Sequence, residues 1–366
     1  MKTIAKIKLL TDEIGAKTLL HTMETFNSAC DEIAKTCFKE GSGSKFNIQT
    51  IVYHNIKKKY GLSAQLVIRA IAKACEAYKL NKKVCPTFKP HGSICYDQRI
   101  LSFKFKQLTP SVSLTTVEGR KSFNIEVRDY FQPRLDRVAG QVDLVYCNGQ
   151  FWLYATTDMP DGTPIKNKDV LGVDLGIVQI ATTSDNETFS GKTIENKRQK
   201  YQKQREQCQK KATKQAKRKL RKVSGSEKRF RTDVNHCISK KLVAKAKDTY
   251  RIIALEDLTG INDRKTVRKS QRAKHHSWAF YQLRKFIEYK AKLAGVSVVL
   301  VDPRNTSRGC SACGHIAKEN RKSQAEFCCI QCGHNENADY NAAKNIRSRG
   351  VSTALLSSAL QPLKAA

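Results

Sequence analysis

Two pairs of cysteines in the last fifth of the chain have the spacing of a metal site. Cys310 and Cys313 form one C-x-x-C pair, Cys329 and Cys332 form the other, and Gly-His follows each pair. Four thiolates suit the tetrahedral coordination of zinc, and a glycine at that position favours the tight turn that directs backbone amides at the sulfurs. We therefore predict that these four cysteines bind one Zn²⁺ ion.

Other interpretations of this cluster use the same residues. Four unrelated buried thiols, or two disulfides, would give the same count. His315 and His334 flank the pairs and are alternative ligands, and Cys328 directly precedes Cys329. We prefer the four paired cysteines because they need no rearrangement, and we interpret Cys328 as a bystander.

Three acidic residues lie at positions where a carboxylate is unusual. Asp174 is inside an apolar strand-like segment, Glu256 ends another, and Asp339 begins a predicted helix after the cysteines. A carboxylate in an apolar strand is costly unless it meets a cation or a base. Three of them together would bind divalent cations, and two Mg²⁺ ions so held can activate water and stabilise the leaving 3′ oxygen of a phosphodiester.

The alternative for each acid is a helix cap or a pair with one of the many lysines. Asp257, next to Glu256, shows the ambiguity. Alternation from Ile252 and Ala254 puts Glu256 on their face of the strand, so we select Glu256.

The overall charge indicates a polyanionic partner. Lysine and arginine outnumber the acids by 67 − 33 = 34 in 366 residues, and such a protein usually contacts nucleic acid. A membrane is not expected, because no apolar run approaches the length of a spanning helix. Met1–Thr3 leads into an alternating strand and not into a signal peptide. The thirteen cysteines are then best explained by a reducing cytosol and one zinc site, so we expect a cytoplasmic protein.

The N-terminal part combines one strand with three helices. Ile4–Leu9 alternates apolar and basic residues, and Thr11 is the expected N-cap of the first helix. Ser63 is the expected cap of the third helix. The polar face of this helix carries candidate nucleic-acid contacts, for which a solvated face is the alternative: Gln65, Arg69 and Lys73.

From about Cys85 to Asp158 the apolar period changes to two. Ser93–Phe105 is predicted to be one strand, and Asn148-Gly149 favours a tight hairpin turn between two others. We expect a β-barrel with a helical insert after its first strand, and barrels of this kind often bind single strands or duplex backbones.

The segment Lys192–Arg231 is helical and contains seventeen Lys/Arg against three Glu. Its few apolar residues form no stripe, so it either bridges domains in solvent or lies along a phosphate backbone, which we favour. The candidate contacts within it are Lys217, Arg218 and Arg221. Asn262–His276 is predicted to be a mobile loop near substrate, and Val351–Ala366 a flexible tail.

Several of these motifs together resemble one family. Gly172-Val-Asp-Leu-Gly176, Ala254-Leu-Glu-Asp-Leu258, the paired C-x-x-C-G-H motifs and Asp339-Tyr-Asn-Ala-Ala343 are similar to the split RuvC nuclease and zinc module of TnpB proteins. These are transposon-encoded RNA-guided nucleases related to compact type V CRISPR effectors. The segments Ser224–Lys240 and Thr306–Cys310 share the resemblance, which covers nearly the whole chain.

The resemblance implies a multidomain α+β protein. The expected parts are a β-barrel wedge domain (1–10 and 80–167), a helical recognition insert (11–79), an RNase H-like (RuvC) α/β nuclease (168–307 and 336–350, with a basic helical segment at 192–250), an inserted zinc-ribbon module (308–335) and a tail (351–366). It also implies that Asp174, Glu256 and Asp339 are the catalytic, Mg²⁺-binding carboxylates. The expected partners are a guide RNA and double-stranded target DNA beside a short motif, and the target sequence is expected to be selected by guide–target pairing. The resemblance also implies a prokaryotic protein that is associated with the nucleoid when engaged. Whether the protein is a monomer or a dimer is left open.

The sequence departs from the family in two places. Asn337 stands where the family often has another acid, which makes Asp339 easier to assign, and Arg308-Gly309 stands where a glutamine–threonine-like pair is common. The expected function is Mg²⁺-dependent, RNA-guided cleavage of both DNA strands. The alternatives are a guided DNA-binding repressor without cleavage, a DNA transposase, and an RNA-binding zinc protein; the three intact acids argue against the first and the last of these.

Overall fold

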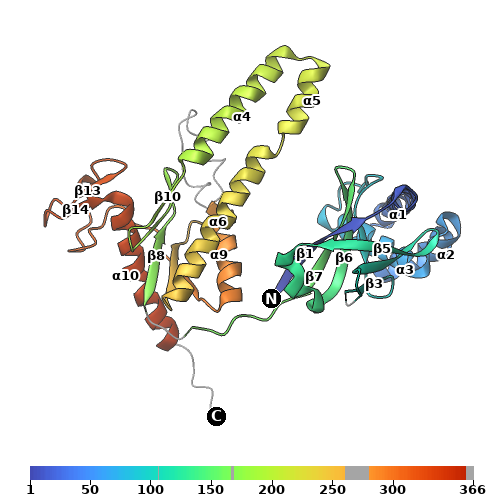
Figure 1. Ribbon diagram of the computed structural model, residues 1–366, viewed down its shortest axis with the longest axis horizontal. Coiled ribbons are helices and arrows are strands. Elements are labelled where there is room, and N and C mark those ends of the chain that lie inside the picture. The colour runs from blue at the N-terminus through green and yellow to red at the C-terminus, as the bar shows by residue number, and fades with distance from the viewer. Residues whose placement is uncertain (106, 166–168, 260–279, 360–366) are drawn as a thin grey trace, which may run out of the picture. The chain divides into compact units, whose positions relative to one another are not determined.

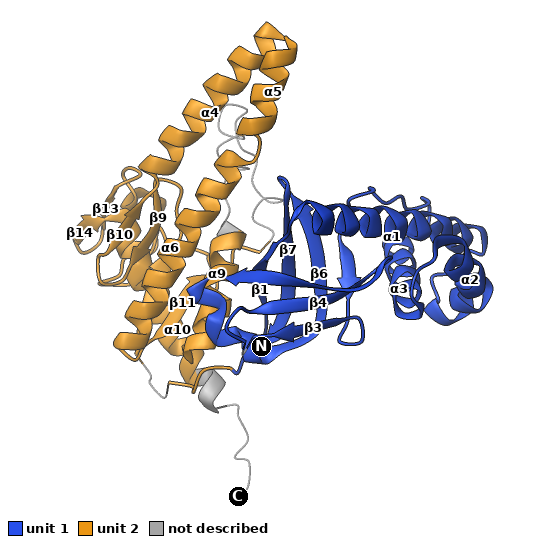
Figure 2. Ribbon diagram, turned by 45° about the vertical axis from the view of Figure 1, so that its right-hand side comes forward, with its two compact units in different colours: residues 1–160 blue, residues 161–366 orange. Residues whose placement is uncertain are grey.

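The computed structural model describes residues 1–105, 107–165, 169–259 and 280–359. It divides into two compact units, Met1–Pro160 and Asp161–Ala366 (Figure 2). The predicted mobile loop Asn262–His276 lies outside the described residues. Within the described part, no helix is long and apolar enough to cross a membrane.

The first unit is built on one antiparallel sheet of seven strands in the order β2-β6-β7-β1-β5-β4-β3. A 3₁₀ helix, η1 (Asp129–Arg137), precedes β6. The strands are β1 (Lys2–Leu10), β2 (Ile94–Tyr96), β3 (Leu101–Lys104), β4 (Ser111–Thr116), β5 (Gly119–Val127), β6 (Val138–Cys147) and β7 (Gln150–Asp158).

This sheet curls nearly into a barrel. Its two edge strands, β2 and β3, are separated by only the short turn from Asp97 to Ile100, so the opposite edges must approach each other. The hydroxyl of Tyr96 on β2 donates to the carbonyl of Thr115 on β4 across this seam, at 3.1 Å. The prediction of a single strand over Ser93–Phe105 is therefore wrong, because this turn splits the segment and lets the sheet fold back on itself.

The hairpin and helix signals in this unit agree with the structure. Asn148 and Gly149 both have positive φ, 53° and 76°, as a tight β6–β7 turn requires. Three helices follow β1 and pack with the sheet in one apolar core: α1 (Glu13–Lys39), α2 (Lys45–Tyr60) and α3 (Ala64–Leu80). Ser63 caps α3 as predicted, whereas Asp12 and not Thr11 caps α1, because the Asp12 carboxylate accepts from the Gly15 amide.

The second unit contains a mixed five-stranded sheet in the order β10-β9-β8-β11-β12. The first three strands in sequence are antiparallel, and β8, β11 and β12 run parallel. They are β8 (Val170–Asp174), β9 (Gln179–Thr183), β10 (Thr188–Ser190), β11 (Ile252–Glu256) and β12 (Val298–Val301). Parallel strands must be connected by a crossover, and helices supply it here.

Helices cover both faces of this sheet (Figure 1). α6 (Ser226–Asp248) and α9 (Phe280–Ala294) bury Leu242 and Ile287 against one face, and α10 (Ala338–Ala359) buries Ile346 against the other. Residues 351–359 are thus the end of α10, so the predicted flexible tail is wrong for them. Residues 360–366 lie outside the described part of the chain.

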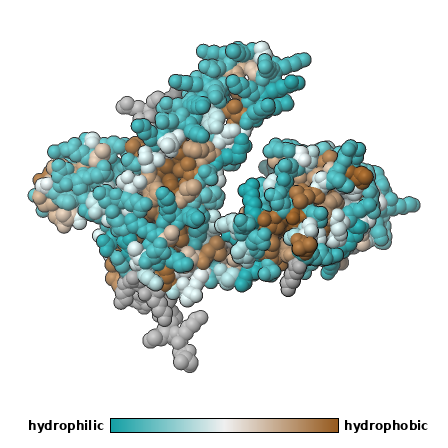
Figure 3. Space-filling model, viewed as in Figure 1, coloured by the Kyte–Doolittle hydropathy of each residue, from teal (hydrophilic) through white to brown (hydrophobic). Residues whose placement is uncertain are grey.

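The basic segment forms two helices and the start of a third. α4 (Lys192–Lys211) ends where Ala212 adopts a left-handed conformation (φ 50°), and α5 (Lys214–Val223) returns beside it. Ser224 and Gly225 then lead into α6, whose later residues enter the core. The view in Figure 3 shows a mainly hydrophilic surface over α4 and α5, which agrees with the absence of an apolar stripe in the sequence.

The cysteines lie in a small module between β12 and α10. It contains η2 (Lys318–Asn320) and the two-stranded sheet of β13 (Glu326–Cys328) and β14 (Asn335–Asn337). Phe327 is fully buried there, together with Cys310, Cys329 and Ala338. This small core is continuous with the first turn of α10.

Candidate active site and cysteine cluster

Asp174 and Glu256 end two neighbouring parallel strands. Asp174 is the last residue of β8 and Glu256 is the last residue of β11, and Val173 pairs with Leu255 one position earlier. Because the register continues, the two acids come side by side at the carboxyl edge of the sheet. Asp339 reaches this edge from the first turn of α10.

The alternation of each strand directs the acids towards α10. Val170 and Ala254 pack against Ile346 of α10, and Asp174 and Glu256 share their faces by the two-residue period. Gly172 lies between Val170 and Asp174. A Cβ there would be 2.2 Å from the Ala343 carbonyl oxygen, so only glycine lets α10 lie this close to β8.

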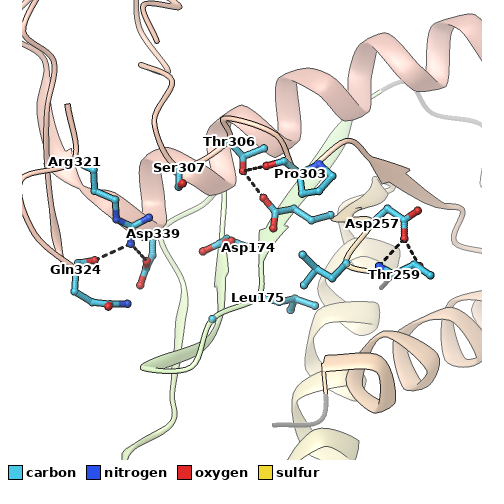
Figure 4. Close-up of a pocket in the computed structure, with 13 residues that line it drawn as sticks. Asp174, Leu175, Asp257, Thr259, Pro303, Thr306, Ser307, Arg321, Gln324 and Asp339 are labelled. Atoms are coloured by element: carbon cyan, nitrogen blue, oxygen red, sulfur yellow. Dashed lines mark hydrogen bonds and ion pairs between the residues drawn. The ribbon is translucent and has the colours of Figure 1, made fainter. Parts of the chain in front are cut away.

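The three carboxylates line one cleft of about 490 Å³. In Figure 4, Asp174 lies between Asp339 and the part of the cleft lined by Thr306. Glu256 and Asp339 are 9% and 8% exposed, so each carboxylate is largely removed from bulk water. Other residues of the cleft come from the ends of β8 and β11, from the loop after β12 and from the cysteine module: Leu175, Gly176, Asp257, Leu258, Thr259, Pro303, Thr306, Ser307, Arg321 and Gln324.

The electrostatics of the cleft favour a bound cation. Burial, and then the nearby charges of Glu256 and Asp339, raise the pKa of Asp174 to about 8, against the weaker opposing effect of Arg321. Burial also raises the pKa of Asp339. Carboxyl groups that are this reluctant to ionise together gain most from a divalent cation, and the donor set of three carboxylates suits Mg²⁺.

Two residues without an assigned role in the sequence analysis contact these acids. Thr306, in the loop after β12, donates a hydrogen bond from its hydroxyl to Glu256 Oε1. Arg321, in the cysteine module, lies 3.4 Å from Asp339 Oδ1 and donates to the carbonyls of Ser323 and Gln324. Thr306 was part of a recognised motif, whereas Arg321 carried no signal among so many basic residues.

The neighbouring acid Asp257 has different partners from Glu256. Its carboxylate accepts from the Thr259 hydroxyl and pairs with Arg284 at 2.8 Å, and these contacts, the one from Thr259 first, lower its pKa. Asp257 also lines this cleft and is exposed. The structure thus gives the two adjacent acids separate environments, one among carboxylates and one beside an arginine.

The four paired cysteines form one cluster. The sulfurs of Cys310, Cys313, Cys329 and Cys332 all lie within 4.8 Å of one another, with Cys310–Cys332 at 3.7 Å and Cys313–Cys329 at 3.6 Å. A tetrahedral zinc with Zn–S bonds of about 2.3 Å would place its sulfurs about 3.8 Å apart. All four cysteines are free, so two disulfides are excluded.

The two halves of the cluster have the same turn geometry. The Cys310 amide donates to the His315 carbonyl and the Cys329 amide to the His334 carbonyl, while Gly314 and Gly333 have φ of 79° and 72°. Both glycines thus lie in the left-handed region, which agrees with the tight turn predicted at these positions. Cys328 and the two histidine rings are not members of the cluster.

Asparagine side chains join the cysteine module to α10. Asn341 donates to the Gly309 carbonyl at 2.8 Å and accepts from the Ser311 amide at 2.9 Å. Asn345 donates to the carbonyls of Thr306 and Gly309, at 2.9 and 2.7 Å. The first cysteine turn is therefore fixed to the helix that carries Asp339.

The predicted nucleic-acid contacts differ in their surroundings. On α3, Gln65 donates to Asp97, Arg69 to Gln141 and the Cys95 carbonyl, and Lys73 to Asn27 and the Ser93 carbonyl, so all three bind within their own unit. On α5 the three candidates, Lys217, Arg218 and Arg221, are exposed. Nucleic-acid contact stays a prediction for both groups.

Fold and site together define an α+β protein with an acidic cleft beside a four-cysteine module. Residues 154–262 match a family model described as a probable transposase, and residues 280–346 match the Cas12f1-like TNB domain. The resemblance to TnpB proteins and compact CRISPR effectors is thereby confirmed for these segments, which contain Asp174, Glu256, Asp339 and the four cysteines.

Individual relatives include proteins of the same kinds as the matched family models. The chain is 45% identical over 118 residues to the CRISPR-associated endodeoxyribonuclease Cas12f1 of Sulfoacidibacillus thermotolerans, covering 32% of this chain and 26% of the relative. It is 38% identical over 136 residues to the TnpB-like protein MJ0751 of Methanocaldococcus jannaschii, covering 36% and 48%. The matched segments thus span between a quarter and a half of these relatives.

A solved structure shares the fold. The structure titled mini-RNA-guided endonuclease CRISPR-Cas_phi3 aligns with a TM-score of 0.56 over 96% of this chain and 92% of its own, at 10% identity. At this identity the similarity concerns the fold. The fold of this chain therefore occurs in a structure titled as a CRISPR-associated mini-RNA-guided endonuclease.

Proposed function

We propose that the protein is an RNA-guided DNA endonuclease that hydrolyses phosphodiester bonds of both DNA strands at one acidic site. The observation that carries the proposal is the convergence of Asp174, Glu256 and Asp339, which are far apart in sequence, in one cleft. The names of the relatives, an endodeoxyribonuclease and a TnpB-like protein, point to the same activity.

The second unit would be the RNase H-like (RuvC) nuclease. Its mixed sheet with helices on both faces supports this assignment. Asp174, Glu256 and Asp339 would hold two Mg²⁺ ions, whose chemistry in such sites is activation of water and stabilisation of the leaving 3′ oxygen. Arg321, beside Asp339, is placed to contact the phosphate that enters the cleft.

The cysteine module would hold one zinc ion. The sulfur separations fit a tetrahedral site, and backbone amides favour the ionised thiol at Cys329. Burial opposes ionisation of Cys329, but the amides of Cys332 and Gln331 lower its pKa to about 6. The ion would be structural, because all four positions around it are taken by protein.

Guide RNA and target DNA would be bound largely through charge. The exposed lysine and arginine side chains of α4 and α5 offer a phosphate-binding surface, which includes Lys217, Arg218 and Arg221. The curled sheet and helices of the first unit would recognise the short motif beside the target. Gln65, Arg69 and Lys73 stay the predicted contacts for this role, and in this structure their side chains bind within the unit.

Two alternatives remain within the same fold. A guided DNA-binding repressor would bind without cleaving, and a DNA transposase would act on the ends of its own element, as the description of one matching family model suggests. The three carboxylates favour cleavage over the repressor. The cysteine module between the second and third acids favours the guided nuclease over the transposase.

The decisive experiment is to express the protein with its flanking DNA, purify it and sequence the RNA that copurifies. We expect a discrete RNA with a constant 5′ part and a variable 3′ end, and cleavage of a DNA target that matches this end. Heterogeneous RNA, with no guided cleavage, would contradict the proposal and favour a transposase or a general nucleic-acid binder.

Asp174→Ala tests the site itself. Removal of this carboxylate should lower cleavage by at least about 10³-fold, since metal-dependent activation of water is lost, while guide and target binding stay nearly unchanged. Cleavage would be followed on a labelled duplex and binding by gel shift. Persistent cleavage by Asp174→Ala would rule out this cleft as the active site.

A further inference from the structure

Thr306 is built into the loop that follows β12 and is almost completely buried, at 3% exposed. Its hydroxyl lies within hydrogen-bond distance of two acceptors, Glu256 Oε1 and the Pro303 carbonyl. A hydroxyl has one proton to donate, and in the form that binds a cation the Glu256 carboxylate is ionised and is the stronger acceptor. The hydroxyl therefore restrains the rotation of the Glu256 carboxylate group.

The backbone of the same residue is held by α10. The Thr306 carbonyl accepts from Asn345 at 2.9 Å, and Asn345 also donates to the Gly309 carbonyl at 2.7 Å, next to Cys310. The side chain of Thr306 thus contacts Glu256, and its main chain is bound to α10, the helix that carries Asp339. A change in the loop would move the two acids relative to each other.

We propose that Thr306 is a positioning residue, whose hydroxyl holds the Glu256 carboxylate in the orientation that binds a divalent cation. This rests on the proposed function for the identity of the site, but it concerns how the site is aligned. The loop that carries Thr306 continues into the first cysteine turn, so the cysteine module sets the position of a hydroxyl in the acidic cleft.

The test compares Thr306→Val, which removes the hydroxyl at nearly constant shape, with Thr306→Ser, which keeps it. The full-length protein, freed of nucleic acid, is titrated with Mg²⁺ by calorimetry, and cleavage is measured as a function of Mg²⁺ concentration. Loss of a group that orients a metal ligand typically costs 10- to 100-fold in affinity or activity. We expect a loss of about 10-fold or more for valine and near-normal binding for serine.

Two controls separate orientation from folding. Zinc content and the melting temperature report on the cysteine module and the fold. Thr22→Val makes the same chemical change at a fully buried hydroxyl of the first unit, which donates to the Thr18 carbonyl at 2.7 Å. It should leave Mg²⁺ binding unchanged. If Thr306→Val does not fold, Thr306→Ala removes the hydroxyl without placing a second methyl group beside the carboxylate.

The outcomes distinguish the two proposals. Equal Mg²⁺ affinity in Thr306→Val and wild type, or equal losses in the valine and serine variants, would overturn the role of the hydroxyl even if guided cleavage is observed. Weaker Mg²⁺ binding by valine alone, in a protein that shows no guided cleavage, would support the positioning role while the proposed function fails.

Discussion

At the residue scale, the charge state of Asp174 links stability to pH. The pKa of this carboxyl is raised to about 8 in the folded protein by burial and by the two neighbouring acids. The folded state therefore binds the proton more tightly than the unfolded state, whose carboxyl ionises near pH 4. Ionisation of Asp174 thus destabilises the protein increasingly from about pH 4 to about pH 8, unless a cation is bound.

Asp174→Asn should remove the destabilisation that ionisation of Asp174 causes. Without Mg²⁺ the variant is expected to be more stable than wild type, by a margin that grows by up to about 1.4 kcal/mol per pH unit between pH 5 and 8. Added Mg²⁺ should stabilise only wild type and reduce the margin. Thermal unfolding at several pH values, with and without Mg²⁺, measures both effects; a margin that does not change with pH would contradict the prediction.

Asp185→Asn is the matched control, for which we expect the opposite effect on the free energy of unfolding. Hydrogen bonds from Arg251, and charges of Arg251 and Lys245, hold the pKa of Asp185 well below its usual range. Its contribution to stability is present above pH 4 and is lost as the pH falls through the lowered pKa. The same substitution should therefore destabilise the protein at neutral pH.

Residue types and spacing were sufficient to nominate the acids and the cysteines. Each of these residues is chemically unusual where it stands, such as a carboxylate in an apolar strand or a repeated C-x-x-C-G-H. Arg321 is one of many basic residues, and Thr306, although part of a motif that resembles the family, is not chemically unusual at its position. Their partners, Asp339 and Glu256, are identified only when the loop after β12 and the cysteine module are folded against the sheet.

At the element scale, the contact of α10 with β8 determines the shape of the cleft. Gly172→Ala would place a Cβ 2.2 Å from the Ala343 carbonyl oxygen and 2.5 Å from the Arg347 amide nitrogen, both in the backbone of α10. The helix would have to move away and take Asp339 with it. Overpacking of this kind costs about 1–3 kcal/mol, and we expect lower thermal stability together with weaker Mg²⁺ binding.

Gly43→Ala provides the comparison for this variant. Its Cβ would meet mainly the side chain of Lys79, which is exposed and flexible, at 2.8 Å. This variant should have normal Mg²⁺ binding and a smaller change in stability. Normal Mg²⁺ binding by Gly172→Ala as well would show that the close helix–strand contact does not set the position of Asp339.

Local signals predicted the elements better than their ends. The period of two and the Asn148-Gly149 turn located the hairpin, and Ser63 located the start of α3. The tail was misjudged because residues 351–359 continue α10 although their sequence lacks a strong apolar pattern. The sequence analysis expected a barrel but missed the turn between β2 and β3, because these short strands pair with different partners, β6 and β4, and periodicity does not encode this pairing.

At the scale of the whole molecule, the chain consists of two units, and only the second contains the acids and the cysteines. Loss of the zinc ion should therefore change the structure of the second unit and not that of the first. Without it, the turns around Cys310 and Cys329 lose their common anchor, and the module that supplies Arg321 and supports Thr306 should loosen. The folding of residues 1–160 should be unaffected.

Cys313→Ser makes this loss specific. We expect the variant to lose its bound zinc ion and its cleavage activity together. Amide hydrogen exchange should become faster in residues 309–337 and in the first turn of α10, and stay unchanged in the first unit. Cys328→Ser, one residue from a ligand but outside the cluster, should keep the zinc, the protection and the activity. If Cys313→Ser loses zinc but cleaves normally, the module does not support the acidic cleft, and the hydrogen bonds from Asn341 and Asn345 would serve only to attach it to α10.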